Sequence, residues 1–143
     1  MNIAIGTDHG GFPIKPAVVD CGAAAYDAKD DFPDFARAVS AAIQRGEAER
    51  GIVICGSGVG VAIAANKMRG IRACLCHDSY SARQGVEHDN MNVLALGGRI
   101  IGDELARELV RAFMSGKFDG GERFVRRMNK VSEIEESEYK SGD

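Results

Sequence analysis

The sequence lacks several features that would place a protein in other functional classes. No apolar stretch approaches the roughly 20 residues of a membrane-spanning helix, so we expect a soluble protein without a membrane partner. Acidic and basic residues are interspersed and the net charge is −3, which gives no broad positive field for nucleic acid. Tryptophan is absent, and this counts against a flavin-binding redox domain.

The four cysteines show neither zinc-ligand spacing nor a disulfide framework. They are Cys21, Cys55, Cys74 and Cys76. The N-terminus runs directly into the strand-like segment Asn2–Gly6, without a basic region followed by a long apolar one, so no signal peptide is expected. Reduced thiols and the lack of a signal together predict a cytoplasmic protein.

Short apolar runs bounded by glycine alternate with longer amphipathic stretches along the chain. This pattern is typical of a parallel sheet with helices on both faces. The expected strands cover Asn2–Gly6, Gly51–Cys55, Ile71–Cys76 and Asn92–Leu96. We therefore predict an α/β fold, a Rossmann-like three-layer α/β/α sandwich whose parallel sheet has four or five strands.

Apolar spacing and stop signals predict further helices after the loops. They run from about Asp31 to Gly46, from Gly102 to Gly116 and from Glu122 to about Ser132. Residues 133–143 are acidic and polar, so we expect a single domain over residues 1–132, followed by a tail that frays or lies on another subunit.

The first crossover is unusually short. Only residues 7–17 separate the first strand from an edge strand expected at Val18–Cys21, and two of them are prolines. A crossover between parallel strands usually needs a dozen residues or more. Either its helix is a stub or Val18–Cys21 is not a regular strand.

The segment Gly51–Gly60 predicts a strand and a glycine-rich turn that lead into a helix of small residues. Glycine permits a sharp turn and lets a ligand approach the backbone amides, which suits an oxyanion or a phosphate. The turn has neither the lysine of a P-loop nor the dinucleotide spacing. The alternative is a tight turn required only for packing.

Cys55 ends the strand before this turn, at the sheet edge where α/β proteins bind ligands. A thiol beside a helix N-terminus can act as a base or a nucleophile, whereas a buried cysteine can also serve only as a small apolar residue. Cys74 and Cys76 lie inside a strand and are expected to pack.

Asp8 and His9 follow the first strand and should reach the same edge. A carboxylate beside an imidazole can bind sugar hydroxyls or phosphate; alternatively, Asp8 caps a helix and His9 is incidental. His88 is interpreted as an acid or hydrogen-bond donor, and His77–Asp78 as a strand end and helix cap. Adjacent His–Asp pairs rarely face one ion, so no metal is predicted.

Arg123 and Arg127 are four residues apart on the last helix, so they lie on one face and could fork around one phosphate. The alternative is a solvated basic face that pairs with the acidic tail.

Together these residues resemble the type B ribose-5-phosphate isomerases, whose relatives include galactose-6-phosphate and allose-6-phosphate isomerases. The similarity covers nearly the whole chain in order. Its segments are Ile3–Phe12, Asp31–Ala36, Gly51–Lys67, Gly70–Ala73, His77–Arg83, Glu87–His88, Asn92–Gly97 and Arg99–Gly102.

The resemblance implies a role for each matching position. Cys55 matches the base that moves a proton between C1 and C2, Ser57 a threonine that assists it, and His88 a ring-opening histidine that comes across a dimer interface. The amides from Gly56 to Gly60, including those of Gly58 and Val59, match the loop that holds the enediolate oxygen. The substrate-binding positions are Asp8, His9 and Asp89, and those that bind phosphate are Arg99, Arg123 and Arg127.

The implied activity is a metal-free, cofactor-free isomerisation of ribose 5-phosphate to ribulose 5-phosphate through an enediolate. The implied assembly is a homodimer with shared sites, with a tetramer as the larger alternative. The chain departs from the family at Phe32, Asp89 and Phe124, where the family has tyrosine, asparagine and histidine, and it lacks about a helix between Lys15 and Val18. These departures leave open another substrate (an allose, galactose or erythrose phosphate) or a noncatalytic phosphosugar-binding subunit.

Overall fold

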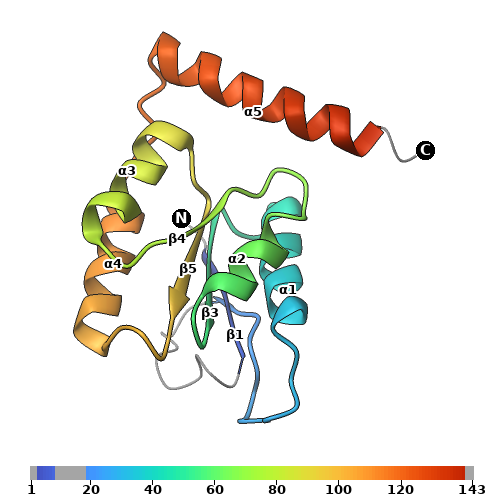
Figure 1. Cartoon of the computed structure of the whole chain (residues 1–143), viewed down its shortest axis with the longest axis vertical. Helices are drawn as coiled ribbons and strands as arrows, with labels where there is room; N and C mark the ends of the chain where they lie inside the picture. The colour runs from blue at the N-terminus through green and yellow to red at the C-terminus, as the bar shows by residue number, and fades with distance from the viewer. Residues whose placement is uncertain (1–2, 9–18, 141–143) are drawn as a thin grey trace.

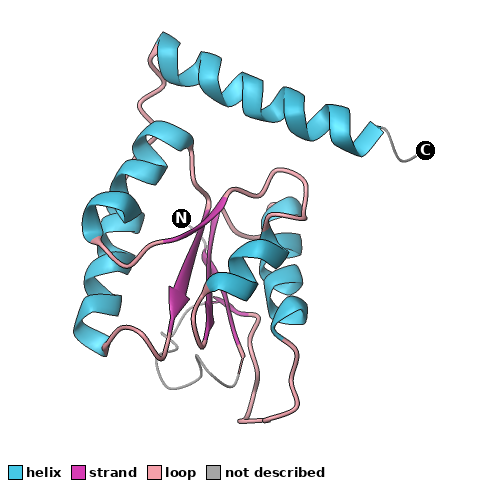
Figure 2. Cartoon of the chain, in the orientation of Figure 1, coloured by secondary structure: helices cyan, strands magenta, loops and turns pink. Residues whose placement is uncertain are grey.

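The computed structural model describes residues 3–8 and 19–140. Five parallel strands form one sheet in the order β2-β1-β3-β5-β4, with helices on both faces (Figures 1 and 2). The strands are β1 (Ile3–Thr7), β2 (Val19–Asp20), β3 (Arg50–Cys55), β4 (Ala73–Leu75) and β5 (Val93–Gly97). The helices are α1 (Phe32–Gln44), α2 (Val59–Ala65), α3 (Ser79–Asp89), α4 (Asp103–Ser115) and α5 (Glu122–Lys140). The predicted α/β fold is confirmed.

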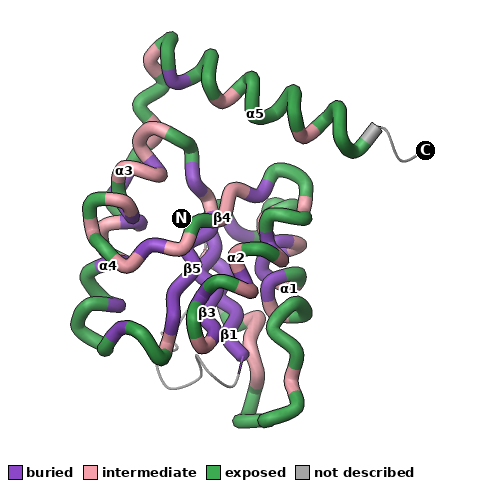
Figure 3. The backbone as a smooth tube through the Cα atoms, viewed as in Figure 1, coloured by how far each residue is buried: buried purple, intermediate pink, exposed green. Residues whose placement is uncertain are grey.

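Alternate residues of the strands pack against different helix layers. One buried cluster joins Ile5, Ile52 and Leu94 to residues of α3 and α4, and the other joins Ala4, Val53 and Val93 to residues of α1 and α2. The three central strands β1, β3 and β5 are accordingly buried over nearly their whole length (Figure 3). The second face carries the smaller side chains, which allow its helices to approach the sheet closely.

The first crossover is as short as the sequence predicts. β2 pairs in parallel with β1, with Ala4 opposite Val19 and Ile5 opposite Asp20. The strand expected at Val18–Cys21 thus exists, but it is only two residues long. Residues 9–18, on which a stub helix was one alternative, lie outside the described residues.

β4 is shorter than the expected strand at Ile71–Cys76, and side-chain hydrogen bonds flank its start. The Asn92 side-chain oxygen accepts from the Arg72 N–H at 2.8 Å, and Asn66 exchanges two 2.8 Å hydrogen bonds with the backbone of Ala73. Since Asn66 follows α2, these bonds also join the end of that helix to the sheet.

The last helix continues well beyond Ser132, where the sequence predicted its end. Glu135 accepts from the Gly70 N–H at 2.9 and 3.1 Å, and the Tyr139 hydroxyl donates to the Lys67 carbonyl. The Arg69 guanidinium lies 5.0 Å from the centre of the Tyr139 ring. Contacts with the turn after α2 therefore keep residues 133–140 helical. None of the helices in the described residues has both the length and the apolar character needed to cross a membrane.

These contacts predict that the tail contributes to stability. A chain of residues 1–132 should lose about 2 kcal/mol of unfolding free energy, because it lacks the hydrogen bonds of Glu135 and Tyr139 and the contact of Arg69 with the Tyr139 ring. Denaturant unfolding, compared with a chain of residues 1–140, measures this loss. Equal unfolding midpoints for the two chains would show that the tail contacts do not stabilise the fold.

Candidate active site

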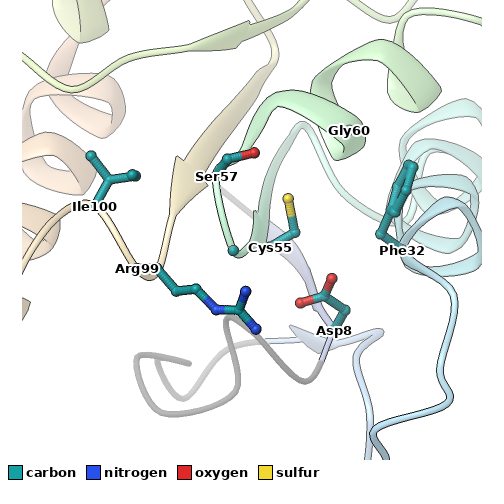
Figure 4. A pocket seen from close by; sticks show the side chains of 8 residues that line it. Asp8, Phe32, Cys55, Ser57, Gly60, Arg99 and Ile100 are labelled. Carbon is teal, nitrogen blue, oxygen red and sulfur yellow. The ribbon is translucent and has the colours of Figure 1, made fainter.

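A cavity of about 390 Å³ opens at the carboxyl edge of the sheet, where β1, β3 and β5 end (Figure 4). It is lined by Asp8, Phe32, Cys55, Gly56, Ser57, Gly60, Arg99 and Ile100. Ligands of parallel α/β sheets bind at this edge. The structure thus brings together six of the site residues predicted from the sequence. It adds Ile100, for which the only signal was its place after Arg99 in the turn that follows β5.

The glycine turn between β3 and α2 has one position that only glycine fits. Gly58 adopts φ 80°, and a Cβ atom on it would lie 2.5 Å from a methyl group of Leu75 and 2.8 Å from the Leu96 carbonyl carbon. Both the left-handed backbone and the lack of space therefore require glycine. The tight turn therefore serves packing and also borders the cavity, and the oxyanion or phosphate site stays a prediction.

Cys55 is buried, and its sulfur forms part of the cavity wall. Figure 4 shows the sulfur in the space between Ser57, Asp8 and Phe32. The Gly58 N–H donates to this sulfur at 3.1 Å. A backbone donor fixes the position of the sulfur and is a partner that a thiolate keeps.

The amides of Gly58 and Val59, predicted to bind substrate, have partners inside the loop. The Gly58 N–H donates to Cys55, and the Val59 N–H donates to the Ser57 hydroxyl at 3.3 Å. Neither residue lines the cavity, whereas Gly56, Ser57 and Gly60 do. In this geometry Gly58 and Val59 orient the thiol and the hydroxyl.

One carboxylate and one guanidinium flank the thiol. The Asp8 carboxylate and the Arg99 side chain both extend to the cavity in Figure 4. Asp8 is 6% exposed, and its N–H donates to the Ile54 carbonyl at 3.2 Å. Arg99 covers Gly56, where an added Cβ would lie 3.5 Å from the Arg99 side chain. His9 lies outside the described residues.

The turn that carries Arg99 is held against the loop that carries Cys55. The Gly98 N–H donates to the Cys55 carbonyl at 2.8 Å, and the Arg99 N–H donates to the Gly56 carbonyl at 3.0 Å. These bonds involve only backbone atoms, so they fix the position of Arg99 relative to Cys55 whatever the neighbouring side chains are.

The remaining predicted site residues lie at the opposite edge of the sheet. α3 ends with His88 and Asp89 close to the start of β5, and α5, which carries Arg123 and Arg127, crosses that amino edge (Figure 1). A strand of five residues places the two edges roughly 13 Å apart. One chain therefore does not bring these four residues to the Cys55 cavity.

His88 packs in a small cluster at this amino edge. Its ring stacks on Phe124, with centroids 4.5 Å apart and an interplanar angle of 24°. Its Nδ1 lies 2.8 Å from the Gln84 amide nitrogen. The Arg123 guanidinium lies 4.6 Å from the Phe124 ring centre. Phe124 thus fixes the positions of both His88 and Arg123.

Two predictions about β4 and the residues after it have different outcomes. Cys76 is buried, as expected, but Cys74 is exposed and lines a second cavity of about 610 Å³ between β4, α3 and α5. The Cys74 thiol donates to the Leu75 carbonyl at 3.7 Å, and a hydrogen bond from the Cys76 thiol lowers the pKa of Cys74. Asp78 caps α3 as predicted, accepting from the Ser81 N–H at 2.7 Å. This backbone bond lowers the pKa of the Asp78 carboxyl.

Within residues 3–8 and 19–140, no three histidine, cysteine or carboxylate side chains are grouped so that they could hold a metal ion. The absence of a metal stays a prediction, since His9 is not among these residues.

A thiol, a carboxylate and a guanidinium beside a glycine loop line a cavity at the carboxyl edge of an α/β domain, which is where proteins of this fold class bind small molecules. The family model for ribose/galactose isomerases matches residues 3–131. A ribose-5-phosphate isomerase B of Escherichia coli is 40% identical over 144 residues, covering 94% of this chain and 96% of the relative. A D-erythrulose-4-phosphate isomerase of Pectobacterium atrosepticum is 40% identical over 132 residues, covering 85% and 87%.

A solved structure supports the same relationship. The ribose-5-phosphate isomerase B of Mycoplasma genitalium, with bound ribulose-5-phosphate, matches with a TM-score of 0.87 and 38% identity, covering 94% of this chain and 96% of that chain. The chain therefore belongs to the ribose/galactose isomerase family and is an aldose–ketose isomerase of sugar phosphates. The resemblance stated from the sequence motifs is confirmed.

The geometry of the glycine turn predicts unequal costs for two alanine substitutions. Gly58→Ala should lower the free energy of unfolding by about 3 kcal/mol, because it adds a steric clash to a left-handed backbone. Gly70→Ala should cost only about 1 kcal/mol, because Gly70 has a similar φ of 73° but nothing within 4 Å of an added Cβ. Denaturant unfolding of both variants checks the difference, and equal costs would contradict the packing argument.

Proposed function

We propose that this chain converts ribose 5-phosphate to ribulose 5-phosphate through an enediolate, with Cys55 as the base. The observation that carries the proposal is the position of the Cys55 sulfur in the cavity wall, held by the Gly58 N–H beside the loop from Gly56 to Gly60. An aldose–ketose isomerisation needs a base that reaches C1 and C2 and donors where negative charge develops on oxygen.

The proposed reaction moves one proton from C2 to C1 and a second proton from O2 to O1. The Cys55 thiolate takes the proton from C2 while the C–H electrons form the C1–C2 double bond and the carbonyl π electrons move to O1. The cavity-lining amides and the Ser57 hydroxyl stabilise the resulting enediolate. The O2 hydroxyl then passes its proton to O1, and the electrons left on O2 form the C2 carbonyl. The electrons of the C1–C2 double bond take the thiol proton at C1, which restores the thiolate. The thiolate and the donors supply both functions, so the proposed reaction uses no metal or cofactor.

Asp8 and Arg99 are proposed to orient the substrate. Asp8 faces the thiol across the cavity, where a carboxylate can accept hydrogen bonds from sugar hydroxyls. Arg99 offers a planar set of donors that suits a phosphate or a developing oxyanion. His9 keeps its proposed role as a second binding residue, on the resemblance alone.

A tetrose phosphate is the second candidate substrate. The chain is equally similar, at 40% identity, to a relative that acts on ribose 5-phosphate and to one that acts on D-erythrulose 4-phosphate. Phe32 lines the cavity with a ring that offers no hydroxyl. A wall without hydrogen-bonding groups suits a substrate that has fewer hydroxyls to satisfy there.

We further propose a homodimer, or a tetramer as the larger alternative, in which the amino edge of one copy completes the cavity of the other. Val59, Ile63 and Ile100, near the cavity, are between 47% and 62% exposed, and Val131 and Ile134 on α5 are 46% and 63% exposed. A two-fold axis pairs two such surfaces reciprocally. It would bring His88, Asp89, Arg123 and Arg127 to a Cys55 cavity.

The four free thiols favour a reducing compartment, so the proposed location is the cytoplasm.

A turnover panel of ribose, erythrose, allose and galactose phosphates tests reaction and substrate together. Ribose 5-phosphate should give the highest kcat/KM, and Cys55→Ala should lower kcat at least about 10³-fold while leaving phosphosugar binding intact. Cys21→Ala is the matched control, because it removes a thiol that does not line the cavity. Binding without turnover would indicate a noncatalytic subunit, and retained turnover by Cys55→Ala would exclude Cys55 as the base.

Mixing two inactive variants tests the shared site. Cys55→Ala and His88→Ala chains, mixed in equal amounts and allowed to exchange subunits, should recover about a quarter of wild-type activity, because half of the dimers are mixed and each holds one intact site. The doubly substituted chain mixed with wild type is the control. No recovery after demonstrated exchange would mean that both residues act within one chain.

A further inference from the structure

Three successive backbone N–H groups, those of Gly97, Gly98 and Arg99, hold the turn that carries Arg99. Gly98 and Arg99 donate to the carbonyls of Cys55 and Gly56, as described above. The third donor, the Gly97 N–H, lies on the other side of β5, facing β4. Its partner is not a backbone carbonyl but the imidazole of His77, whose Nε2 accepts at 3.3 Å. Of the three bonds, this one alone depends on the identity of a side chain.

His77 takes this position because the backbone of β4 turns away before it reaches Gly97. β4 pairs with β5 as far as Leu75 opposite Ala95, and the Cys76 N–H donates to the Ala95 carbonyl at 3.3 Å. Asp78 is already the N-cap of α3, so the chain leaves the sheet at His77. The imidazole therefore replaces the missing partner of the ladder.

Gly97 is in close contact with the glycine turn between β3 and α2. A Cβ on Gly97 would lie 2.7 Å from the Ser57 carbonyl oxygen and 2.8 Å from its carbon. A displacement of Gly97 by a few tenths of an ångström would therefore move either the Ser57 peptide or the Arg99 turn. Both belong to the wall of the cavity.

We propose that His77 is a positioning residue for the isomerisation: its half-buried imidazole holds Gly97 so that Arg99 and the Ser57 peptide keep their places around the substrate. This role rests on the proposed function. It requires the ring to carry its proton on Nδ1, since Nε2 must present a lone pair to the Gly97 N–H. In this proposal His77 does not contact the substrate, whereas the catalytic residues do.

Three variants of the full-length chain test the proposal with ribose 5-phosphate. His77→Phe keeps a ring but has no acceptor, and should raise KM or lower kcat/KM roughly tenfold. His77→Gln presents an amide oxygen as acceptor, and should stay within about threefold of wild type. Asp78→Ala is the matched control: it removes a neighbouring hydrogen bond that caps α3, so it should lower Tm without changing KM.

Hydrogen exchange at the Gly97 amide gives a readout that does not depend on turnover. Exchange should be faster in His77→Phe and close to wild type in His77→Gln. The role of His77 is overturned if His77→Phe leaves both KM and this exchange unchanged, or if Asp78→Ala raises KM as much as His77→Phe does. A wild-type chain that turns over no sugar phosphate in the panel overturns the proposed function and this role with it.

Discussion

The close approach of the glycine turn to the ends of β4 and β5 is the constraint on which the site depends. Gly58 can lie against Leu75 and the Leu96 backbone only because it lacks a Cβ and accepts a left-handed conformation. That conformation directs the Gly58 N–H at the Cys55 sulfur and starts α2 at the next residue. The position of the thiol, the start of a helix and the packing of two strands thus follow from one backbone angle.

The packing of the sheet allows the glycine turn to lie this close to the strands. Small residues on the face that packs against α1 and α2 let those helices approach the strands closely, while isoleucines and leucines fill the opposite face. The turn after β5 then needs only backbone hydrogen bonds to reach the loop, together with the imidazole of His77. The charged groups of the cavity, Asp8 and Arg99, are carried by the ends of β1 and β5, so the same core positions both.

Patterns within single elements could be read from the sequence, but contacts between distant segments could not. Strand spacing and the glycine turn predicted the sheet, the α2 start and the Cys55 cavity. The predicted end of α5, at about Ser132, was wrong. Residues 133–140 are kept helical by contacts with the Lys67–Gly70 turn, which is more than 60 residues away in the chain. The exposure of Cys74 was missed because its alternation with Cys76 indicates a shared face, not what covers that face.

The predicted site residues lie at two opposite edges of the sheet, and this separation also affects which substrate one chain could convert. Ribose 5-phosphate closes into a ring through its free O4 hydroxyl, so its isomerisation first needs a group that opens the ring. A tetrose 4-phosphate has that oxygen esterified and stays open. Under the proposed function, the cavity of one chain holds the groups that move the proton, and His88 from a second copy would be needed only for a ring-forming sugar. Dependence on His88 is therefore a chemical marker of the pentose substrate, because an open-chain tetrose phosphate makes no demand on it.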